Sequence, residues 1–472
     1  MNCTPARRHP FHVCFAVLML CAAGQAAPAL AQAARQSVRL DAAERTVVVE
    51  QIARLLEENY VFPDVAARNG VQLRQRLAAG AFDDMADAQA YAEALTRELQ
   101  SVSHDKHMRV ELRPSPGAGG RQDDGSAAAR QLREMRSRNF GFERVERLDG
   151  NVGYLDLRYF AQPELARDMT AAAMQLLSNS DAIIVDLRNN NGGSPELVQL
   201  ICSYFFGTRT HLNSLYWRRG DRTQEFWTID GLTGRRLSRV PLFVLTSPRT
   251  FSGAEEFAYN MQTRRRATII GGTSGGGANP GDVMPVNERF AIFVPTGRAI
   301  NPVTGTNWEG VGVKPDVRVD APVALDSALA RARLAARVYA EAEAAQEAIR
   351  RQALMRRLTE ASTLAGRREV AAAERSVGEA LSQAIADSIV GERAINTMGY
   401  RYLQAGDRPL AIAIFKANVA AFPRSANTYD SLGEAYMQNG DRELAIQNYR
   451  ESLARDPNNT NARAMLEKLG TR

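Results

Sequence analysis

The chain has 472 residues, 45% hydrophobic and 24% charged, which allows about three domains with ordinary globular cores. Its 59 basic and 53 acidic residues give a formal net charge of +6 without a dense basic block. This balance argues against a nucleic-acid surface, so we expect no nucleic-acid partner. No His/Cys cluster has metal-ligand spacing, and neither a metal nor another cofactor is expected.

Residues 1–31 have the features of a cleavable secretory signal. Arg7 and Arg8 supply a positive start, an apolar segment from Phe11 to Ala23 follows, and Ala29-Leu30-Ala31 fits a cleavage site. The apolar segment is too short to span a bilayer, and no later stretch approaches roughly 18 apolar residues. The sequence therefore predicts a periplasmic or secreted chain with no integral membrane segment after cleavage.

The cysteines fit this interpretation. Cys3, Cys14 and Cys21 lie in the predicted signal, so only Cys202 would remain in the mature chain. A single cysteine cannot form an internal disulfide, and we expect Cys202, in the apolar run LVQLICSYFF, to be a buried small hydrophobic residue. A lipoprotein signal ending at Cys21 is the weaker alternative, because Leu20 rather than a small residue precedes it.

The segment 40–112 predicts an N-terminal three-helix bundle. VVVEQIARLLEENYV, VAARNGVQLRQRLAAG and DMADAQAYAEALTRELQSV carry apolar residues at helical spacing. Gly80 and Asp84 stand where helix caps are expected. The next segment, 113–146, contains the Gly/Ser/Ala-rich stretch Ser115–Arg130 and is predicted to be a linker.

Residues 147–322 change to an alternation of strand-like and helix-like segments. Strand-like VGYLDLRYF, DAIIVDLRNN, PLFVLTS and RATIIGG are interleaved with helical ELARDMTAAAMQLLSN and FSGAEEFAYNMQ. This β-α-β order predicts an α/β domain with a largely parallel sheet. Residues 323–389 are rich in Ala, Arg and Glu and predict long connecting helices.

The C-terminal segment 390–472 contains an internal repeat. Gly406 corresponds to Gly440, and Asp407 to Asp441, a spacing of 34 residues. The pattern resembles the tetratricopeptide repeat, a helix-turn-helix unit of that period. The resemblance implies an all-α solenoid that docks a protein partner, with a packing or dimerisation element as the alternative.

Ser252 stands where the strand PLFVLTS passes into the helix GAEEFAYNM. A serine there exposes its hydroxyl at the carboxyl edge of the sheet, beside the free N–H groups of the helix N-terminus. Gly253 is one candidate oxyanion donor, and the turn DLRNNNGG supplies a second from Gly192 or Gly193. The alternatives are that Ser252 or Thr250 only caps the helix and that the glycines form an ordinary turn.

SHDKHMRV contains His104 and His107, and histidine is the usual proton acceptor for a serine nucleophile. His107, which begins a strand-like run, is preferred as the base, with His104 as the alternative. In NWEGVGVKPD, Glu309 is either a carboxylate that orients the imidazole or a plain loop residue.

The loop GGTSGGGANPGD contains Gly275, Gly276 and Gly277. It lacks the pattern of a phosphate-binding loop. We expect it to form a flexible wall of a substrate cleft.

Together LEENYVFPDVAAR, SHDKHMRV, DLRNNNGG, TSPRTFSGAEEF and NWEGVGVKPDV resemble the C-terminal processing, or tail-specific, protease family over residues 40–320. The branch that includes the interphotoreceptor retinoid-binding protein and the tricorn protease core is the most similar. The resemblance implies a ClpP/crotonase-like β-α-β core, no cofactor and a peptide or protein substrate. It also implies catalysis by Ser252, His107 and Glu309, with an oxyanion hole at Gly193 and Gly253.

The sequence departs from many family members in two places. Members with a Ser–Lys dyad carry the lysine in T-F-G-K-G, whereas this chain has S-G-G-G-A with Gly277 at the lysine position. That residue excludes the dyad. The segment between His107 and Val152 is also too short for the PDZ domain that many members contain.

The sequence therefore predicts an exported serine-type peptidase. Two alternatives stay open. One is a non-proteolytic carrier of apolar ligands on the same fold, as the retinoid-binding members imply. The other is an interaction scaffold in which the repeats are the main working part.

Overall fold

The computed structural model describes residues 40–113 and 124–470, which belong to two compact units. The predicted signal, with Cys3, Cys14 and Cys21, lies outside the described residues. None of the helices in the described ranges has the length and apolarity needed to cross a membrane. Among the described residues, unit 1 comprises 40–113, 124–131, Asn213–Glu225 and Gly276–Gly312, and unit 2 comprises Leu132–Leu212, Phe226–Gly275 and 313–470.

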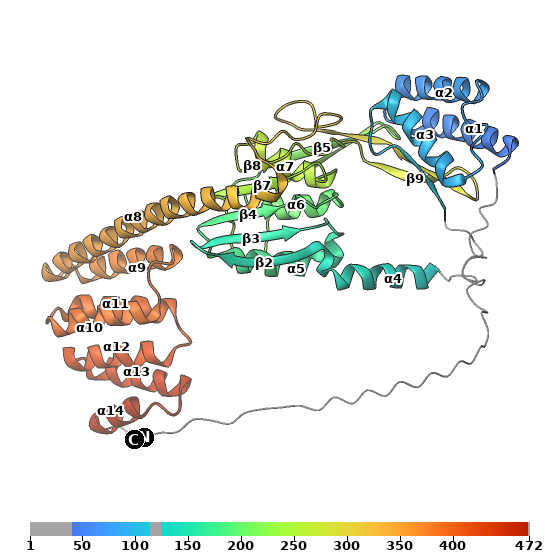
Figure 1. The fold of residues 1–472 in the computed structure, drawn as a ribbon. Coiled ribbons are helices and arrows are strands. Elements are labelled where there is room, and N and C mark those ends of the chain that lie inside the picture. Colours follow the sequence, from blue (N-terminus) through green and yellow to red (C-terminus); the bar gives the residue numbers. More distant parts are fainter. Residues whose placement is uncertain (1–39, 114–123, 471–472) are drawn as a thin grey trace, which may run out of the picture. The chain divides into compact units, whose positions relative to one another are not determined.

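The centre of unit 2 is a six-stranded sheet with the order β12-β8-β7-β4-β3-β2 (Figure 1). Five of these strands are parallel, and β2 pairs antiparallel with β3 at one edge. The predicted α/β core is therefore confirmed. The strands are β2 (Phe142–Leu148), β3 (Val152–Leu157), β4 (Ala182–Asp186), β7 (Leu242–Thr246), β8 (Thr268–Gly271) and β12 (Val317–Arg318).

Both faces of this sheet are buried, which explains the continuous apolar runs of its strands. On one face, Tyr154, Ile184 and Leu245 pack against helix α8 (Ala324–Gly366), whose alanines at every fourth position allow close approach. The opposite face is covered by α5 (Pro163–Leu177), α6 (Pro195–Ser203) and α7 (Gly253–Thr263). Cys202 of α6 is buried and free, and burial raises the pKa of its thiol.

The far end of α8 packs on a series of shorter helices in the same unit. Equivalent contacts recur in two of the helix pairs. Gly399 lies directly against the ring of Phe415, and Gly433 lies in the same way against the ring of Tyr449. The helices are α9 (Val370–Ala386), α10 (Glu392–Gln404), α11 (Arg408–Ala421), α12 (Ala426–Asn439), α13 (Arg442–Arg455) and α14 (Thr460–Lys468).

Unit 1 contains three N-terminal helices and two small sheets. The helices share one core with strand residues Phe290 and Ile292. One sheet has the order β1-β10-β9, and the other has the order β11-β5-β6. The elements are α1 (Ala42–Asn59), α2 (Pro63–Ala78), α3 (Ala88–Ser103), β1 (Arg109–Leu112), β5 (His211–Trp217), β6 (Arg222–Trp227), β9 (Gly281–Pro285), β10 (Phe290–Pro295) and β11 (Gly297–Ile300).

The domain boundaries differ from the predicted ones in two respects. Residues 276–312 were assigned by sequence to the α/β domain, but they pack with the N-terminal helices because β10 pairs with β1. Residues 113–146, predicted to be a linker, contain helix α4 (Asp124–Ser137) and the start of the edge strand β2. Strand pairing across a long sequence separation leaves no local pattern, so the sequence could not reveal the first difference.

Candidate active site

Ser252 occupies a strained turn between β7 and α7. Its φ of 53° and ψ of −121° are unfavourable for a residue with a side chain, and such strain persists where surrounding contacts impose it. The N–H of Ser252 donates to Oε2 of Glu255 (2.8 Å). The Thr250 hydroxyl is engaged elsewhere, since it donates to the carbonyl of Leu187 (2.7 Å). Thr250 is therefore not the cap of α7.

The turn after β4 is fixed by the side chain of Asn190. Its amide nitrogen donates to the carbonyl of Leu157 (2.9 Å), and its oxygen accepts the N–H of Gly192 (2.8 Å). The Asn190 carbonyl accepts the N–H of Phe251 (3.0 Å), which ties this turn to the residue before Ser252. Asn190 was not predicted from the sequence as a site residue, although it stands inside the DLRNNNGG motif.

Gly192 and Gly193 lie directly against the serine turn. Their φ values are 105° and 134°, and a Cβ on Gly193 would come within 2.0 Å of the Phe160 carbonyl oxygen. A Cβ on Gly192 would be 2.8 Å from both the Gly253 nitrogen and the Ser252 Cβ. Only glycine permits this approach. The consequence is that the backbone N–H groups of Gly193 and Gly253 lie near one another, beside Ser252.

Neither of these two N–H groups donates to an acceptor within residues 40–113 and 124–470. Two backbone donors beside a serine hydroxyl are the elements of an oxyanion hole. We call Ser252, Gly253, Gly192, Gly193 and Asn190 the nucleophile cluster. All five residues belong to unit 2.

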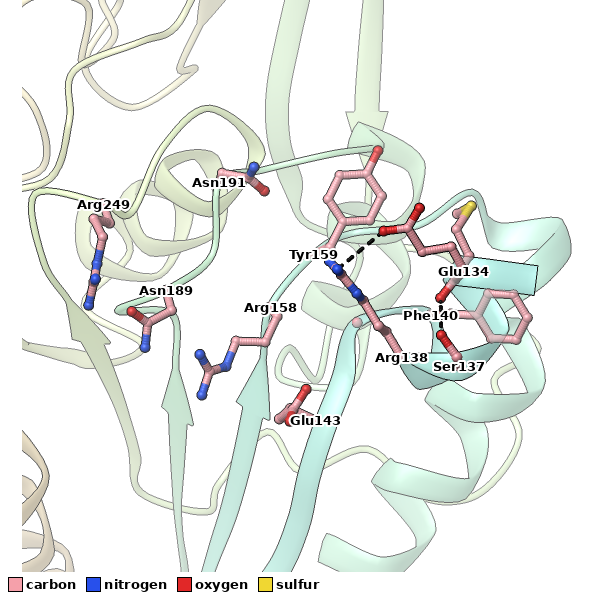
Figure 2. A pocket seen from close by; sticks show the side chains of 12 residues that line it. Glu134, Ser137, Arg138, Phe140, Glu143, Arg158, Tyr159, Asn189, Asn191 and Arg249 are labelled. Atoms are coloured by element: carbon pink, nitrogen blue, oxygen red, sulfur yellow. Dashed lines mark hydrogen bonds and ion pairs between the residues drawn. The ribbon is translucent and has the colours of Figure 1, made fainter. Parts of the chain in front are cut away.

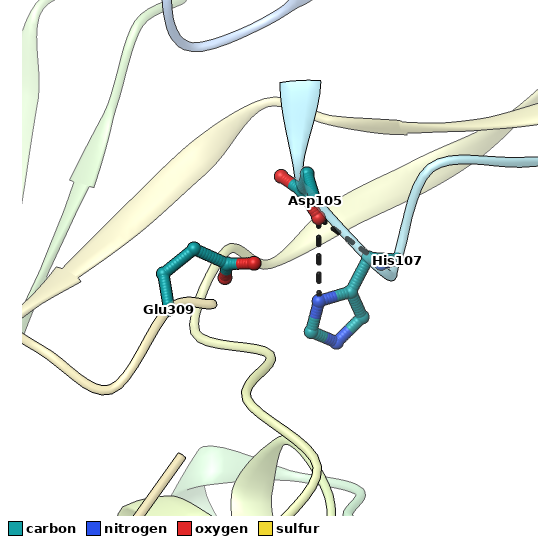
Figure 3. Close-up of side chains that lie close together, drawn as sticks. All are labelled: Asp105, His107 and Glu309. Atoms are coloured by element: carbon teal, nitrogen blue, oxygen red, sulfur yellow. Dashed lines mark hydrogen bonds and ion pairs between the residues drawn. The ribbon is translucent and has the colours of Figure 1, made fainter. Parts of the chain in front are cut away.

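His107, Asp105 and Glu309 form a second group, the histidine cluster, in unit 1 (Figure 3). Each residue offers one nitrogen or oxygen atom that could bind a metal ion, and these atoms all lie within 4.8 Å of one another. Oδ1 of Asp105 is 3.8 Å from Nδ1 of His107. The His107 ring is stacked on Phe293 of β10, which restricts its orientation.

Asp105 was not selected from the sequence, but it is the most firmly held member of the cluster. It is only 1% exposed. Oδ2 accepts hydrogen bonds from the Asn279 amide (2.9 Å) and the Tyr60 hydroxyl (3.3 Å), while Oδ1 accepts the N–H of His107 (3.0 Å). The signal in the sequence was the Asp-Lys-His spacing, which places the carboxylate beside the imidazole of His107.

Burial sets the protonation behaviour of the histidine cluster. Burial, and secondarily the charge of Arg109, lower the pKa of His107 to about 4. Burial also raises the pKa of Asp105 and that of the Tyr60 phenol. An imidazole with a depressed pKa is neutral at pH 7, which is the form that accepts a proton.

Glu309 is held by the glycine loop that precedes β9. Its Oε2 accepts the N–H of Ala278, and the indole of Trp308 donates to the Gly277 carbonyl (2.7 Å). The Gly310 N–H donates to the Gly276 carbonyl (3.1 Å). These bonds tie the loop to the segment around Glu309, where a Cβ on Gly276 would come within 3.1 Å of the Gly310 carbonyl carbon.

The remaining candidates are placed as follows. Gly275, in unit 2, donates its N–H to the Thr250 carbonyl (2.9 Å). His104 is an exposed residue in the left-handed conformation at the C-terminus of α3. The histidine cluster has as many potential metal ligands as a metal site needs, but most of its carboxylate oxygens are already occupied. Both Asp105 oxygens and one Glu309 oxygen already accept hydrogen bonds, so the arrangement fits orientation of an imidazole better than metal binding.

A cavity of about 890 Å³ opens in unit 2 at the carboxyl ends of the parallel strands (Figure 2). Asn189 and Asn191, which flank Asn190, line it, and so does Arg249 from the serine turn. Ligands of parallel α/β sheets bind at this edge. The cavity thus adjoins the nucleophile cluster within one unit.

A parallel α/β sheet with a serine at a strained strand-to-helix turn, next to two backbone N–H donors, is the arrangement of serine hydrolases. Residues 151–319 match the model of peptidase family S41, and residues 26–138 match that of the N-terminal domain of peptidase S41 in eukaryotic IRBP. The chain therefore belongs to peptidase family S41, which confirms the resemblance found in its motifs.

Individual relatives match over part of their length. The carboxy-terminal-processing protease of Bartonella bacilliformis is 29% identical over 182 residues, 38% of this chain and 41% of that protein. The chloroplastic carboxyl-terminal-processing peptidase 3 of Arabidopsis thaliana is 28% identical over 173 residues, 35% of this chain and 31% of that protein. The chain thus spans less than half the length of these relatives. The solved photosystem II D1 C-terminal processing protease has a TM-score of 0.36 at 17% identity, covering 58% of this chain and 93% of that one.

Proposed function

We propose that this chain is a serine peptidase with Ser252 as its nucleophile, His107 as its general base and Glu309 as a carboxylate that orients His107. Ser252 Oγ attacks the scissile carbonyl carbon, and its proton passes to His107. The negative charge that develops on the carbonyl oxygen is stabilised by the N–H groups of Gly193 and Gly253.

The second half of the reaction uses the same groups. His107 gives its proton to the leaving amine, and the C–N bond breaks to leave an acyl ester on Ser252. A water molecule then gives a proton to His107 and attacks the ester carbonyl. His107 returns that proton to Ser252 as the peptide acid leaves.

The observation that carries the proposal is the strained turn at Ser252 together with the N–H groups of Gly193 and Gly253. A serine that only capped α7 would need neither a φ of 53° nor a second glycine turn packed against it. Strain of this kind costs about 1–3 kcal/mol and is concentrated at functional sites.

The choice of base rests on chemistry and burial. Gly277 stands where a lysine base would be needed, and a glycine has no side chain to accept a proton. His107 is buried beside two carboxylates, while His104 is exposed. We therefore assign the proton acceptor to His107 and the orienting role to Glu309, with Asp105 as a further positioning residue.

The direct test replaces Ser252 with Ala in the purified chain and measures hydrolysis of casein and labelling by a fluorophosphonate probe. The proposal expects both to disappear, while the exposed control Ser101→Ala keeps both. Hydrolysis that persists in Ser252→Ala would contradict it. If the native chain is neither labelled nor active but binds a fluorescent fatty acid, the carrier alternative is favoured instead.

We also infer export and a docking role for the C-terminal helices. The positively charged, apolar start of the chain supports a periplasmic or secreted location, which cell fractionation of the native chain would test. The recurring Gly–aromatic contacts at Gly399 and Gly433 support a tetratricopeptide solenoid. Deleting 390–472 is expected to spare hydrolysis of a short peptide and to impair that of a protein substrate. Loss of both would favour the packing alternative.

A further inference from the structure

The cavity beside the nucleophile cluster has a charge pattern of its own. It is lined by residues of α4 and β2 and by the segments that follow α4, β3, β4 and β7, and it includes Arg138, Arg158 and Arg249 (Figure 2). Its volume, about 890 Å³, is sufficient for several residues of an extended peptide. All of its lining residues belong to unit 2.

Two of the three arginines are neutralised. Arg158 forms a two-pronged ion pair with Asp156, with both N–O distances at 2.6 Å. Arg138 pairs with Glu134 one helical turn away in α4 (3.2 Å). The hydrogen bonds to Asp156, and to a smaller extent the charge of Glu143, raise the pKa of Arg158. The acidic groups around the cavity are thus associated with Arg138 and Arg158.

Arg249 differs from both. Its guanidinium forms no ion pair with any carboxylate of the described residues, and Figure 2 draws no interaction between it and the other residues that line the cavity. Its backbone is nevertheless fixed, because its N–H donates to the Ser247 hydroxyl (3.1 Å), which in turn donates to the Arg188 carbonyl (2.6 Å). The chain thus holds an uncompensated cation three residues before Ser252.

Two amides accompany this cation. Asn189 and Asn191 line the same cavity, and neither side chain hydrogen-bonds to another described residue. Asn190 between them is engaged with Leu157 and Gly192, so the two flanking amides are held at fixed backbone positions. A guanidinium with adjacent amide N–H donors matches the geometry and charge of a carboxylate.

We propose that Arg249, with Asn189 and Asn191, binds a carboxylate of the peptide substrate next to the bond that Ser252 cleaves. This inference rests on the proposed peptidase function and adds a substrate class to it, peptides with a negative charge close to the scissile bond. The carboxylate can come from a chain terminus or from an Asp or Glu side chain. Both offer the same two oxygens to the guanidinium.

The test separates binding from hydrolysis. Immobilised Ser252→Ala protein is exposed to a randomised decapeptide library prepared once as free acids and once as C-terminal amides, and retained peptides are identified by mass spectrometry. A chain-terminal carboxylate predicts retention of the acids over the amides. A side-chain carboxylate predicts enrichment of Glu over Gln in both libraries. Adding Arg249→Ala is expected to reduce the preference for carboxylates roughly ten- to a hundredfold, because the substitution removes hydrogen bonds to a charged group.

Matched variants keep the result interpretable. Arg167, an exposed arginine of α5 outside the cavity, provides the control Arg167→Ala, which should keep the preference. Arg249→Lys should keep part of the preference for carboxylates, because lysine retains the positive charge but lacks the paired N–H groups of the guanidinium. Absence of any carboxylate preference in Ser252→Ala, or a preference that survives Arg249→Ala, would overturn the inference. A native chain that hydrolyses no library peptide while Ser252→Ala keeps the preference would refute the peptidase proposal alone.

Discussion

Oδ1 of Asp105 lies 3.8 Å from Nδ1 of His107, and both side chains are buried. This separation is longer than a hydrogen bond, so the carboxylate holds His107 through the backbone N–H that it accepts (3.0 Å) rather than through the ring. Buried charges interact more strongly than exposed ones. An imidazolium formed during catalysis would therefore be stabilised by Asp105 as well as by Glu309.

Asp105→Asn tests this positioning role. The substitution keeps the shape of the side chain but removes the negative charge, and we expect kcat for peptide hydrolysis to fall by roughly a hundredfold. Fluorophosphonate labelling of Ser252 should slow in parallel, whereas KM changes little. The exposed Asp64→Asn is the control. A variant with native kcat and an unchanged pH profile would show that Asp105 is only structural.

The pH dependence follows from the depressed pKa of His107. Since its folded-state pKa is about 4, we expect hydrolysis to persist on the acid side until the pH approaches 4, where protonation removes the base. In the unfolded chain the same histidine titrates near 6.5, so it takes up a proton first in the unfolded state. Stability should accordingly fall as the pH drops from about 6.5 and level off below about 4.

Urea unfolding at a series of pH values measures this slope, with His107→Gln as the comparison. The variant should lose part of the dependence between these two pH values. An activity profile with an acid limb near 6.5 in the native chain would contradict the expectation.

Strain at Ser252 predicts an opposition between stability and activity. Ser252→Gly places the residue type that tolerates positive φ into the turn, and the released strain outweighs the added freedom of the unfolded chain by about 1 kcal/mol. We expect a raised thermal midpoint with complete loss of hydrolysis. Ser252→Ala, which keeps the Cβ, should be inactive without that gain, and differential scanning calorimetry distinguishes the two.

Gly193→Ala should also lower hydrolysis, but by adding strain to a turn instead of releasing it. The new Cβ would meet the Phe160 carbonyl at 2.0 Å, so the turn must move and carry the Gly193 N–H away from Ser252. A loss of roughly 10²–10³ in kcat is expected for removing one oxyanion donor. Gly366→Ala is the control, because a Cβ there meets nothing within 4 Å. Equal activity in both variants would remove Gly193 from the oxyanion hole.

The serine turn was predictable because its determinants are local. Ser252 directly follows an apolar strand and precedes an amphipathic helix. The glycines of DLRNNNGG indicate the second turn. The contact between the two turns was not predictable, since it depends on Asn190 bonding to Leu157 and Phe251. A short polar residue in a loop has too many possible partners for sequence alone to choose among them.

The histidine cluster was also only partly predictable from the sequence. The motif around His107 was recognised, but Asp105 was overlooked although it is two residues away, because its importance lies in burial and in bonds to Asn279 and Tyr60. Those partners are distant in sequence. The pairing of β1 with β10, which moves residues 276–312 into unit 1, is likewise a long-range relation.

Helix α8 has 43 residues and leaves the sheet of unit 2 to reach the C-terminal helices. At 1.5 Å per residue it is about 65 Å long, and each residue also turns the helix by about 100°. Adding or deleting one residue in its middle would therefore rotate the helices that follow, with Gly399 and Gly433, by about 100° around the axis of α8. Adding or deleting about 18 residues, which make five whole turns, would leave their direction unchanged. The length of α8 sets an angle as well as a reach.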